Sequence, residues 1–218
     1  LFTPSPDADR NLLREGIPVD RILRVGNIMI DALDGVRARA SRVDLRRRFS
    51  LDGAGYGVAT LHRPSNVDDP ARLGELVTGL DAVATSLPLI LPLHPRTAER
   101  LACFGLRFRC VRVVEPVGYL EMVALMERAS VVLTDSGGIQ EETTALGVPC
   151  LTLRPNTERP ITIERGTNRL VPELTAASIQ KAFREVMADP PQGRRPELWD
   201  GHTAARIAGQ IRRWLDGR

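Results

Sequence analysis

The sequence predicts an α/β fold, namely a Rossmann-like, doubly wound parallel sheet. Short runs of β-branched residues alternate with helical patterns over most of the 218 residues, as in chains built from βαβ units. Polar motifs containing histidine, arginine or paired glycines come after several of the predicted strands. Open parallel sheets bind ligands beyond the carboxyl ends of their strands, so the motifs and the runs support the same fold class.

The first part of the chain is expected to hold a strand at Ile22–Val25 and an amphipathic helix at Ile28–Ala40. The segment Arg42–Gly57, with three consecutive arginines and three glycines, is interpreted as a linker and turn. Residues 1–40 thus form a βα piece set apart from the rest of the chain.

The rest of the chain repeats strand and helix. Strands are predicted where the sequence is short and apolar, at Tyr56–Leu61, Pro88–Leu93, Val111–Val114, Ser130–Thr134 and Cys150–Leu153. Helices are predicted where the spacing is amphipathic, at Asp69–Ser86, Thr97–Phe104, Tyr119–Ala129, Gly138–Leu146, Ala176–Ala188 and Thr203–Leu215. The Pro- and Arg-rich segment Asp189–Pro196 is interpreted as a solvated connector between the last two helices.

These elements predict four parts. Residues 1–40 are expected to be the last βα piece of a preceding N-terminal Rossmann-like domain, and 41–55 the linker. Residues 56–200 form a second Rossmann-like domain, and 201–218 a C-terminal helix. The chain starts with Leu1 rather than methionine, and we expect it to be a piece of a longer protein.

Composition narrows the functional classes. The net charge of +3 and the aromatic content of 4% do not favour a nucleic-acid surface, which uses basic clusters and stacking rings. The sequence lacks an apolar stretch of the roughly 18–20 residues needed to span a bilayer, and no signal peptide opens the chain. The three cysteines form no CxxC motif, so neither a disulfide framework nor a metal site is expected. We expect a cytoplasmic protein without a cofactor.

The strongest chemical signal is the stretch Thr134–Glu142, which joins a predicted strand to a predicted helix. Gly137 and Gly138 allow close backbone approach, and the free N–H groups of a helix N-terminus bind phosphate. Ser136 can add a hydroxyl, and Glu142, one helical turn after Gly138, can accept hydrogen bonds from vicinal hydroxyls of a ribose. The alternative is an ordinary capped helix with solvated polar residues in its first turn.

Further candidates lie at the ends of other strands. His62 and Arg63 come after one strand, His94 after the next, and Arg159 lies on the loop after Cys150–Leu153. Each is placed where an anion would bind. The alternatives are histidines satisfied by the backbone and arginines in surface ion pairs or in a proline-bounded surface loop.

Taken together, the motifs resemble the non-hydrolysing UDP-N-acetylglucosamine 2-epimerase family. The segments that carry the resemblance are Thr60–Asp68, Leu93–Arg96, Glu115–Leu120, Leu133–Glu142, Asn156–Pro160 and Glu164–Asn168. The resemblance implies a longer, two-domain GT-B-like protein with a nucleotide sugar between its domains, of which this chain is the C-terminal, UDP-binding half. The missing N-terminal domain is then an expected partner, and a homodimer is left open.

The resemblance also implies roles for single residues. Ser136, Gly137 and Gly138 would hold the diphosphate of UDP, and Glu142 the ribose. The remaining expected contacts to UDP come from Arg63, His94, Met122 and Arg159, with Met122 placed at the uracil by its backbone. His62 would act near the phosphates or the reacting sugar and is the expected catalytic residue.

The reaction implied is reversible inversion at C2 to the N-acetylmannosamine epimer, through elimination of UDP and its re-addition. The carboxylates that move protons in this family belong to the N-terminal domain, so the chain alone is expected to be inactive. Many bacterial members have Arg-Glu-Asn or Ala-Glu-Asn where this chain has Pro64-Ser65-Asn66, and no allosteric residue is carried over from that loop.

Four other interpretations stay open. Two are enzymes of the same architecture: a UDP-sugar glycosyltransferase and a hydrolysing epimerase that releases the free sugar. A third is a non-catalytic module that binds a UDP-sugar. The fourth, a generic flavodoxin-like domain, requires the motifs at the strand ends to be coincidental.

Overall fold

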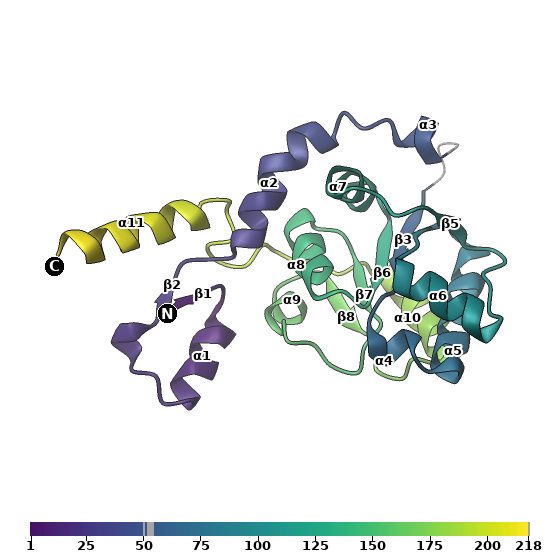
Figure 1. The fold of residues 1–218 in the computed structure, drawn as a ribbon, viewed down its shortest axis with the longest axis horizontal. Helices are drawn as coiled ribbons and strands as arrows, with labels where there is room; N and C mark the ends of the chain where they lie inside the picture. The colour runs from purple at the N-terminus through teal and green to yellow at the C-terminus, as the bar shows by residue number, and fades with distance from the viewer. Residues whose placement is uncertain (50, 52–54, 218) are drawn as a thin grey trace.

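The computed structural model describes residues 1–49, 51 and 55–217, without the side chain of residue 46, and is dominated by a six-stranded parallel sheet (Figure 1). The strands of the sheet are β3 (Gly57–Thr60), β4 (Leu89–Pro92), β5 (Arg112–Val114), β6 (Val131–Thr134), β7 (Cys150–Thr152) and β8 (Asn168–Leu170). Their spatial order is β5-β4-β3-β6-β7-β8. This is the strand order of a doubly wound Rossmann sheet, and it confirms the predicted fold class.

The order in which the chain adds strands reverses between β3 and β6. These two strands are parallel neighbours and pair from Gly57 opposite Val131 to Thr60 opposite Thr134. On one side of this junction the chain proceeds to β4 and β5, and on the other to β7 and β8. The loops after β3 and β6 therefore diverge and leave a crevice at the carboxyl ends of the strands, where ligands bind in such sheets.

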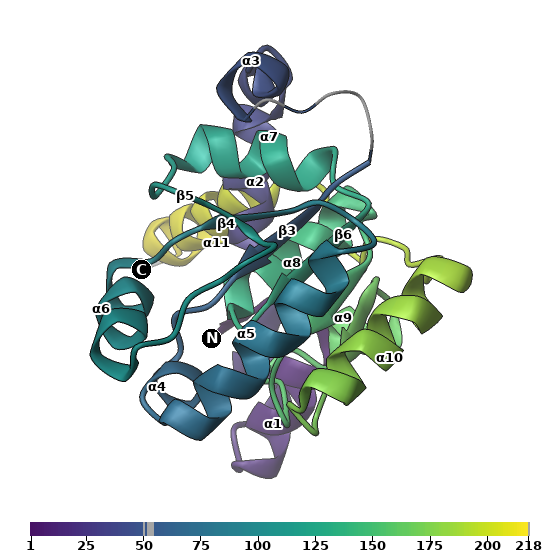
Figure 2. The ribbon, with the colours of Figure 1, turned by 90° about the vertical axis from the view of Figure 1, so that its right-hand side faces the viewer.

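Helices cover both faces of the sheet because successive strand residues point to opposite sides. On β6, Val131 and Leu133 join one buried cluster and Val132 joins the other. The first cluster is covered by α5 (Pro70–Ala84), α6 (Pro95–Phe104) and α10 (Ala176–Ala188). The second is covered mainly by α2 (Ile28–Ala40), α7 (Tyr119–Glu127) and α8 (Gly137–Leu146). Figure 2 shows α5 and α10 on one side of the sheet and α7 on the other.

The N-terminal part forms a second, two-stranded parallel sheet of β1 (Phe2–Thr3) and β2 (Leu23–Arg24). The helix α1 (Pro6–Arg14) and the 3₁₀ turn η1 (Val19–Arg21) connect these strands. The helix α2 leads from this sheet onto the second face of the large sheet, where Ile30 is fully buried.

The C-terminal part returns to this N-terminal region, and α11 (Thr203–Asp216) lies on the same side of the molecule as β1 and β2 (Figure 1). Trp199 is buried and donates its indole N–H to the carbonyl of Pro4, 2.9 Å away. Both terminal nitrogens of Arg195 lie 2.8 Å from the carboxylate of Asp34 on α2. The segment that contains Arg195 and Trp199 is therefore bonded to the N-terminal part of the chain.

The structure contains short elements that we did not predict, among them α1, α3 (Leu45–Phe49), α4 (Pro64–Val67), α9 (Ile161–Glu164) and β8. The sequence does contain the features of a helix N-terminus at α1, namely Pro6 at its first position and the acidic Asp7 and Asp9 in its first turn. By contrast, β8 is a polar strand at the edge of the sheet, without the apolar run that marked the others.

The segment predicted as a linker, residues 41–55, contains the short helix α3, and its role between two domains stays a prediction. Leu45 and Phe49 are buried against the core of the second face, because a single helical turn brings two apolar side chains four residues apart onto one side. The remainder of the linker prediction falls partly on residues 50 and 52–54, which lie outside the described residues.

Within the described ranges, no helix is long and apolar enough to cross a membrane. Cys150 is fully buried in β7, and burial raises the pKa of its thiol to about 12. Such a thiol stays protonated and unreactive at neutral pH.

Candidate functional site

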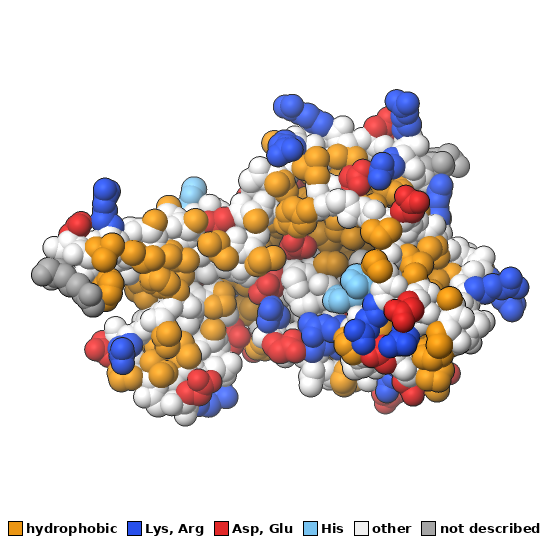
Figure 3. Space-filling view, viewed as in Figure 1, with side chains coloured by type: hydrophobic (Ala, Val, Ile, Leu, Met, Phe, Trp, Pro, Cys, Tyr) orange, Lys and Arg blue, Asp and Glu red, His pale blue; other side chains and the backbone are white. Residues whose placement is uncertain are grey.

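The site lies where β3 and β6 end. Thr60 and Thr134 close the two strands, with their hydroxyl oxygens 2.6 Å apart. Beyond them is a pocket of about 210 Å³ whose lining includes His62, His94, Met122 and Ser136. On the face shown in Figure 3, a hollow lined by apolar side chains adjoins histidine and basic side chains. The pocket thus has an apolar side and a cationic edge.

Asp135, the residue after β6, joins the two loops of the site. Its side chain is fully buried. It accepts hydrogen bonds from the backbone N–H groups of His62 and Arg63, at 3.0 and 2.9 Å, and from the side-chain amide of Asn66 at 3.3 Å. The Nδ1 atom of His62 lies 2.9 Å from its second oxygen. All four partners are donors, so this buried carboxylate is satisfied as an anion.

The α8 helix begins two residues after Asp135, at Gly137. Ser136 is its N-cap residue, and no capping hydrogen bond is made by the Ser136 hydroxyl. A methyl group built on Gly137 would lie 3.6 Å from Nη2 of Arg63 and 3.7 Å from Nη2 of Arg159. Two guanidinium groups therefore converge on the first residue of the helix, where its free N–H groups already favour an anion.

Arg159 is held in this position by residues of α8. Its Nε lies 3.0 Å from a carboxylate oxygen of Glu141, and its backbone N–H donates to Thr157 at 3.0 Å. Thr157 in turn donates to the side-chain carbonyl of the buried Gln140, at 2.6 Å. Glu158 pairs instead with Arg154, at 2.6 Å, which lowers the pKa of its carboxyl to about 2.

Glu141 and Glu142 are both buried carboxylates. Burial raises the pKa of Glu141, and the nearby charge of Arg159 opposes that rise. Burial also raises the pKa of Glu142, which accepts a hydrogen bond from the hydroxyl of Tyr119 at 2.9 Å. The Tyr119 hydroxyl thus already bonds to the carboxylate predicted to meet a ribose.

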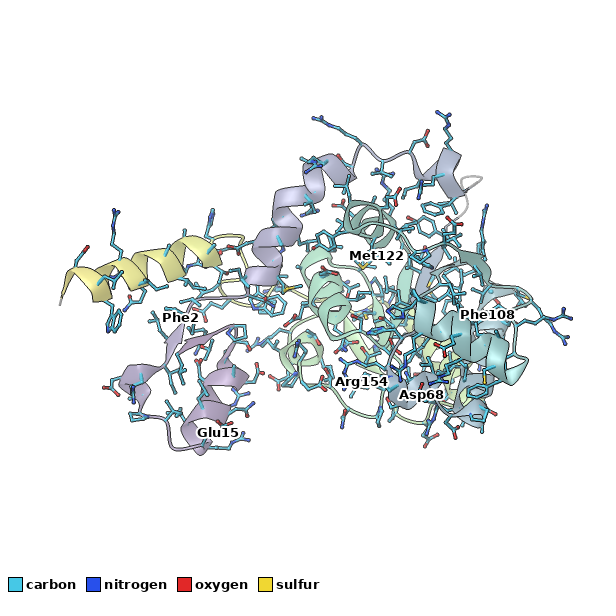
Figure 4. All side chains as sticks on the ribbon, viewed as in Figure 1. Phe2, Glu15, Asp68, Phe108, Met122 and Arg154 are labelled. Atoms are coloured by element: carbon cyan, nitrogen blue, oxygen red, sulfur yellow. The ribbon has the colours of Figure 1, made fainter. Side chains whose placement is uncertain are left out.

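His94 and Met122 complete the pocket on the side of α6 and α7. His94 is the N-cap residue of α6, and its Nδ1 accepts a hydrogen bond from the backbone N–H of Arg96 at 3.2 Å. Its ring centroid is 5.5 Å from that of His62. Met122 lines the same pocket beside Ile139 of α8. In Figure 4, Met122 lies above Arg154, with nitrogen-bearing side chains between them.

The structure brings most of the predicted site residues together. His62, His94, Met122 and Ser136 share the pocket, and Arg63, Arg159 and Gly137 meet beside it. Gly138 is the next residue of α8, and a methyl group built on it would come no nearer than 3.9 Å, to Met29 of α2. Glu142 lies on α8 but, unlike these residues, does not line the pocket itself.

Sequence reasoning missed Asp135, Glu141 and Tyr119 as members of this site. Asp135 has the residue type and position of a helix N-cap, so nothing in the sequence indicated that it accepts hydrogen bonds from the loop after β3. Glu141 belongs to α8, and Arg159 lies near it rather than pairing with its sequence neighbour Glu158. Tyr119 was the first residue of a predicted helix, and only its distance to Glu142 shows their contact.

Comparison with known proteins agrees with the motifs. A family model for UDP-N-acetylglucosamine 2-epimerase matches residues 1–212. The chain belongs to this family. The UDP-N-acetylglucosamine 2-epimerase of Methanocaldococcus jannaschii is 38% identical over an alignment 217 residues long, which covers 95% of this chain and 59% of the relative. A UDP-2,3-diacetamido-2,3-dideoxy-D-glucuronate 2-epimerase of Pseudomonas aeruginosa is 42% identical over an alignment 175 residues long, which covers 78% of this chain and 48% of the relative.

Solved structures of such epimerases share the fold. The M. jannaschii enzyme in complex with UDP-GlcNAc and UDP matches with a TM-score of 0.86 and 38% identity, over 97% of this chain and 60% of that one. The Neisseria meningitidis enzyme bound to UDP-GlcNAc matches with a TM-score of 0.81 and 29% identity, over 97% of this chain and 61% of that one. The chain therefore spans about half to three fifths of the length of these GT-B-like epimerases.

Proposed function

We propose that this chain provides the UDP-binding half of an enzyme that interconverts UDP-N-acetylglucosamine and UDP-N-acetylmannosamine. The observation that carries the proposal is the convergence of Arg63 and Arg159 on Gly137, at the N-terminus of α8. Two cations and a row of free amides at the end of a doubly wound sheet fit a diphosphate. The membership of the chain in the epimerase family supports the same ligand.

The diphosphate would bind the backbone amides of Gly137 and Gly138 and the hydroxyl of Ser136, whose own N–H donates to Thr134 at 3.0 Å, with the two arginines on its outer oxygens. The apolar part of the pocket, formed by residues such as Met122 and Val117, would take the uracil ring, with His94 beside it. Glu142 would accept hydrogen bonds from the ribose hydroxyls.

This placement determines the chemistry. In the elimination, a base removes the proton at C2 of the sugar and the C1–O bond breaks, with its electron pair passing to the departing phosphate. Negative charge then grows on UDP, where Arg63, Arg159 and the amides of α8 stabilise it. Re-addition of UDP to C1, with a proton delivered to the other face of C2, gives the epimer.

A second substrate is a candidate because the P. aeruginosa relative, at 42% identity, acts on a diacetamido uronate sugar according to its name. Both sugars carry UDP, so the same site would bind either one. Turnover of the two UDP-sugars by the complete protein separates these candidates.

The first test is a calorimetric titration of the chain with UDP, with uridine as the ligand that lacks phosphate. We expect saturable binding of UDP and binding of uridine that is at least tenfold weaker, because each charged hydrogen bond to phosphate contributes about 1.5–3 kcal/mol. Equal affinities for the two ligands would contradict the diphosphate site. A simple flavodoxin-like domain without this site would bind neither.

We also propose that residues 1–40 complete an N-terminal Rossmann-like domain of the full-length protein, and that this domain carries the acid and base groups. The 218-residue chain is then expected to give no measurable conversion of UDP-N-acetylglucosamine, assayed by separation of the two epimers. Conversion by the pure chain would show that the proton-transfer groups lie within it. Release of free sugar by the complete protein would favour the hydrolysing alternative, and sugar transfer to an acceptor the glycosyltransferase.

A further inference from the structure

We propose that Asp135 is the positioning residue of His62: it sets which ring nitrogen of His62 carries the proton and turns the other towards the phosphates. The part of the proposal that concerns phosphate rests on the function proposed above. The part that concerns the ring depends only on contacts within the chain.

The contacts determine the proton on the ring. Asp135 is fully buried, and Nδ1 of His62 lies 2.9 Å from its Oδ1. Its Oδ2 accepts the backbone N–H groups of His62 and Arg63 at 3.0 and 2.9 Å. A carboxylate surrounded by donors can only accept, so Nδ1 of His62 carries a proton. The neutral ring then has its lone pair on Nε2, while His62 lines the pocket.

His94 has the opposite arrangement. Its Nδ1 accepts the backbone N–H of Arg96 at 3.2 Å, so the proton of the neutral His94 ring is on Nε2. The two rings are 5.5 Å apart between centroids, yet they present different groups to the pocket. His94 offers a donor at Nε2, and His62 offers a donor there only when its ring is doubly protonated.

This arrangement gives His62 a chemical role. With Nδ1 held by Asp135, the ring has a fixed orientation and Nε2 is the nitrogen left to contact a ligand, as in carboxylate–histidine pairs generally. In the proposed complex, Nε2 of His62 would meet the diphosphate at the edge of the pocket that His62 lines.

Replacing Asp135 with asparagine inverts the arrangement. Oδ2 accepts from the backbone N–H groups of His62 and Arg63 and from the amide of Asn66, whereas Oδ1 only shares the His62 N–H, at 3.2 Å. An oxygen is therefore favoured at Oδ2, and the amide nitrogen takes the place of Oδ1 and donates to Nδ1 of His62. The neutral His62 ring must then carry its proton on Nε2. Asp81→Asn is the matched control, since Asp81 likewise accepts backbone N–H groups, from Arg109, Cys110 and Val111, but no histidine.

The experiment is nitrogen-15 NMR of histidine-labelled protein at pH 8, without ligand. The three histidines are assigned by replacing His94 and His202 in turn. We expect the proton of His62 on Nδ1 in the wild type and in D81N, and on Nε2 in D135N, with His94 on Nε2 throughout. A wild-type His62 protonated on Nε2, or a D135N ring that keeps its proton on Nδ1, overturns the proposal. If D135N does not fold, the wild-type spectrum alone decides.

The second readout is the affinity for UDP at pH 8. The neutral wild-type ring has its lone pair on Nε2, whereas the neutral ring of D135N carries an N–H there, so we expect D135N to bind UDP about tenfold more tightly than D81N, the gain of one charged hydrogen bond. Equal affinities of D135N and D81N would contradict a role of Asp135 through His62. Absence of UDP binding in both proteins would instead contradict the UDP site and leave the NMR result to stand by itself.

Discussion

Replacing Arg159 with methionine is expected to lower the affinity for UDP by about 100-fold, or about 3 kcal/mol. The variant removes one of the two guanidinium groups that meet at Gly137, together with the hydrogen bonds to phosphate that we propose for it. Calorimetry with UDP measures the loss. Arg169→Met is the matched control, because Arg169 forms an exposed pair with Asp189 at 3.9 Å, which contributes little, and it should bind UDP as the wild type does.

The same substitution should also destabilise the fold at neutral pH, by about 1–3 kcal/mol. Glu141 is buried, and Arg159 is the cation that opposes the rise of its pKa. Without that cation, the pKa of Glu141 rises further and its ionisation opposes folding. The loss should therefore shrink as the pH falls and Glu141 binds a proton in the folded state.

A double variant separates the two effects. Adding Glu141→Gln to Arg159→Met removes the buried charge, so the free energy of unfolding at pH 7 should recover while the affinity for UDP stays low. Recovery of both would mean that Arg159 acts only as the partner of Glu141 and makes no contact with UDP.

Glu142→Gln is expected to have opposite effects on binding and on stability. Loss of a charged acceptor for the ribose hydroxyls should weaken UDP binding by roughly 1–3 kcal/mol. The control is a UDP analogue without the 2′- and 3′-hydroxyls, for which the wild type and the variant should have equal affinity. An unchanged affinity for UDP itself would remove Glu142 from the ribose site.

The stability effect depends on the pKa of Glu142, which burial raises above its ordinary value of 4.5. A raised pKa means that the folded state binds the proton more tightly than the unfolded state does, so ionisation costs stability as the pH rises past 4.5. The neutral glutamine avoids this cost and can still accept from Tyr119. The variant should therefore unfold at higher temperature than the wild type at pH 7, and the difference should vanish at acidic pH where Glu142 is protonated in both states.

Much of the fold was accessible from the sequence because the central strands are apolar on both faces. Val131–Thr134 is such a strand, and the glycines after it mark the start of α8. The strand β8 escaped prediction because it pairs on one side only, with β7, and has the polar sequence Asn168-Arg169-Leu170. Its first residue, Asn168, is polar but buried, and its side chain is satisfied by hydrogen bonds, among them one from Thr152 at 2.7 Å.

The candidate site shows a similar division. Ser136, Gly137 and Gly138 were recognisable because their chemistry is local: a tight turn and a helix N-terminus next to each other in the sequence. Asp135 was not, because three of its donors come from His62 and Arg63, more than 70 positions earlier. The choice between Glu141 and Glu158 as the partner of Arg159 likewise depends on how the loop after β7 folds over α8, which no local pattern encodes.

The hydrogen bond from Trp199 to Pro4 spans 195 positions of the sequence, and this has a consequence for the order of folding. Contacts between distant positions form late, since the entropy of closing so long a loop must be met first. All six strands of the large sheet, which ends at Leu170, lie between positions 57 and 170 and pair over shorter separations than this contact. We therefore expect the hydrogen bond between Trp199 and Pro4 to form after the strands of the large sheet have paired.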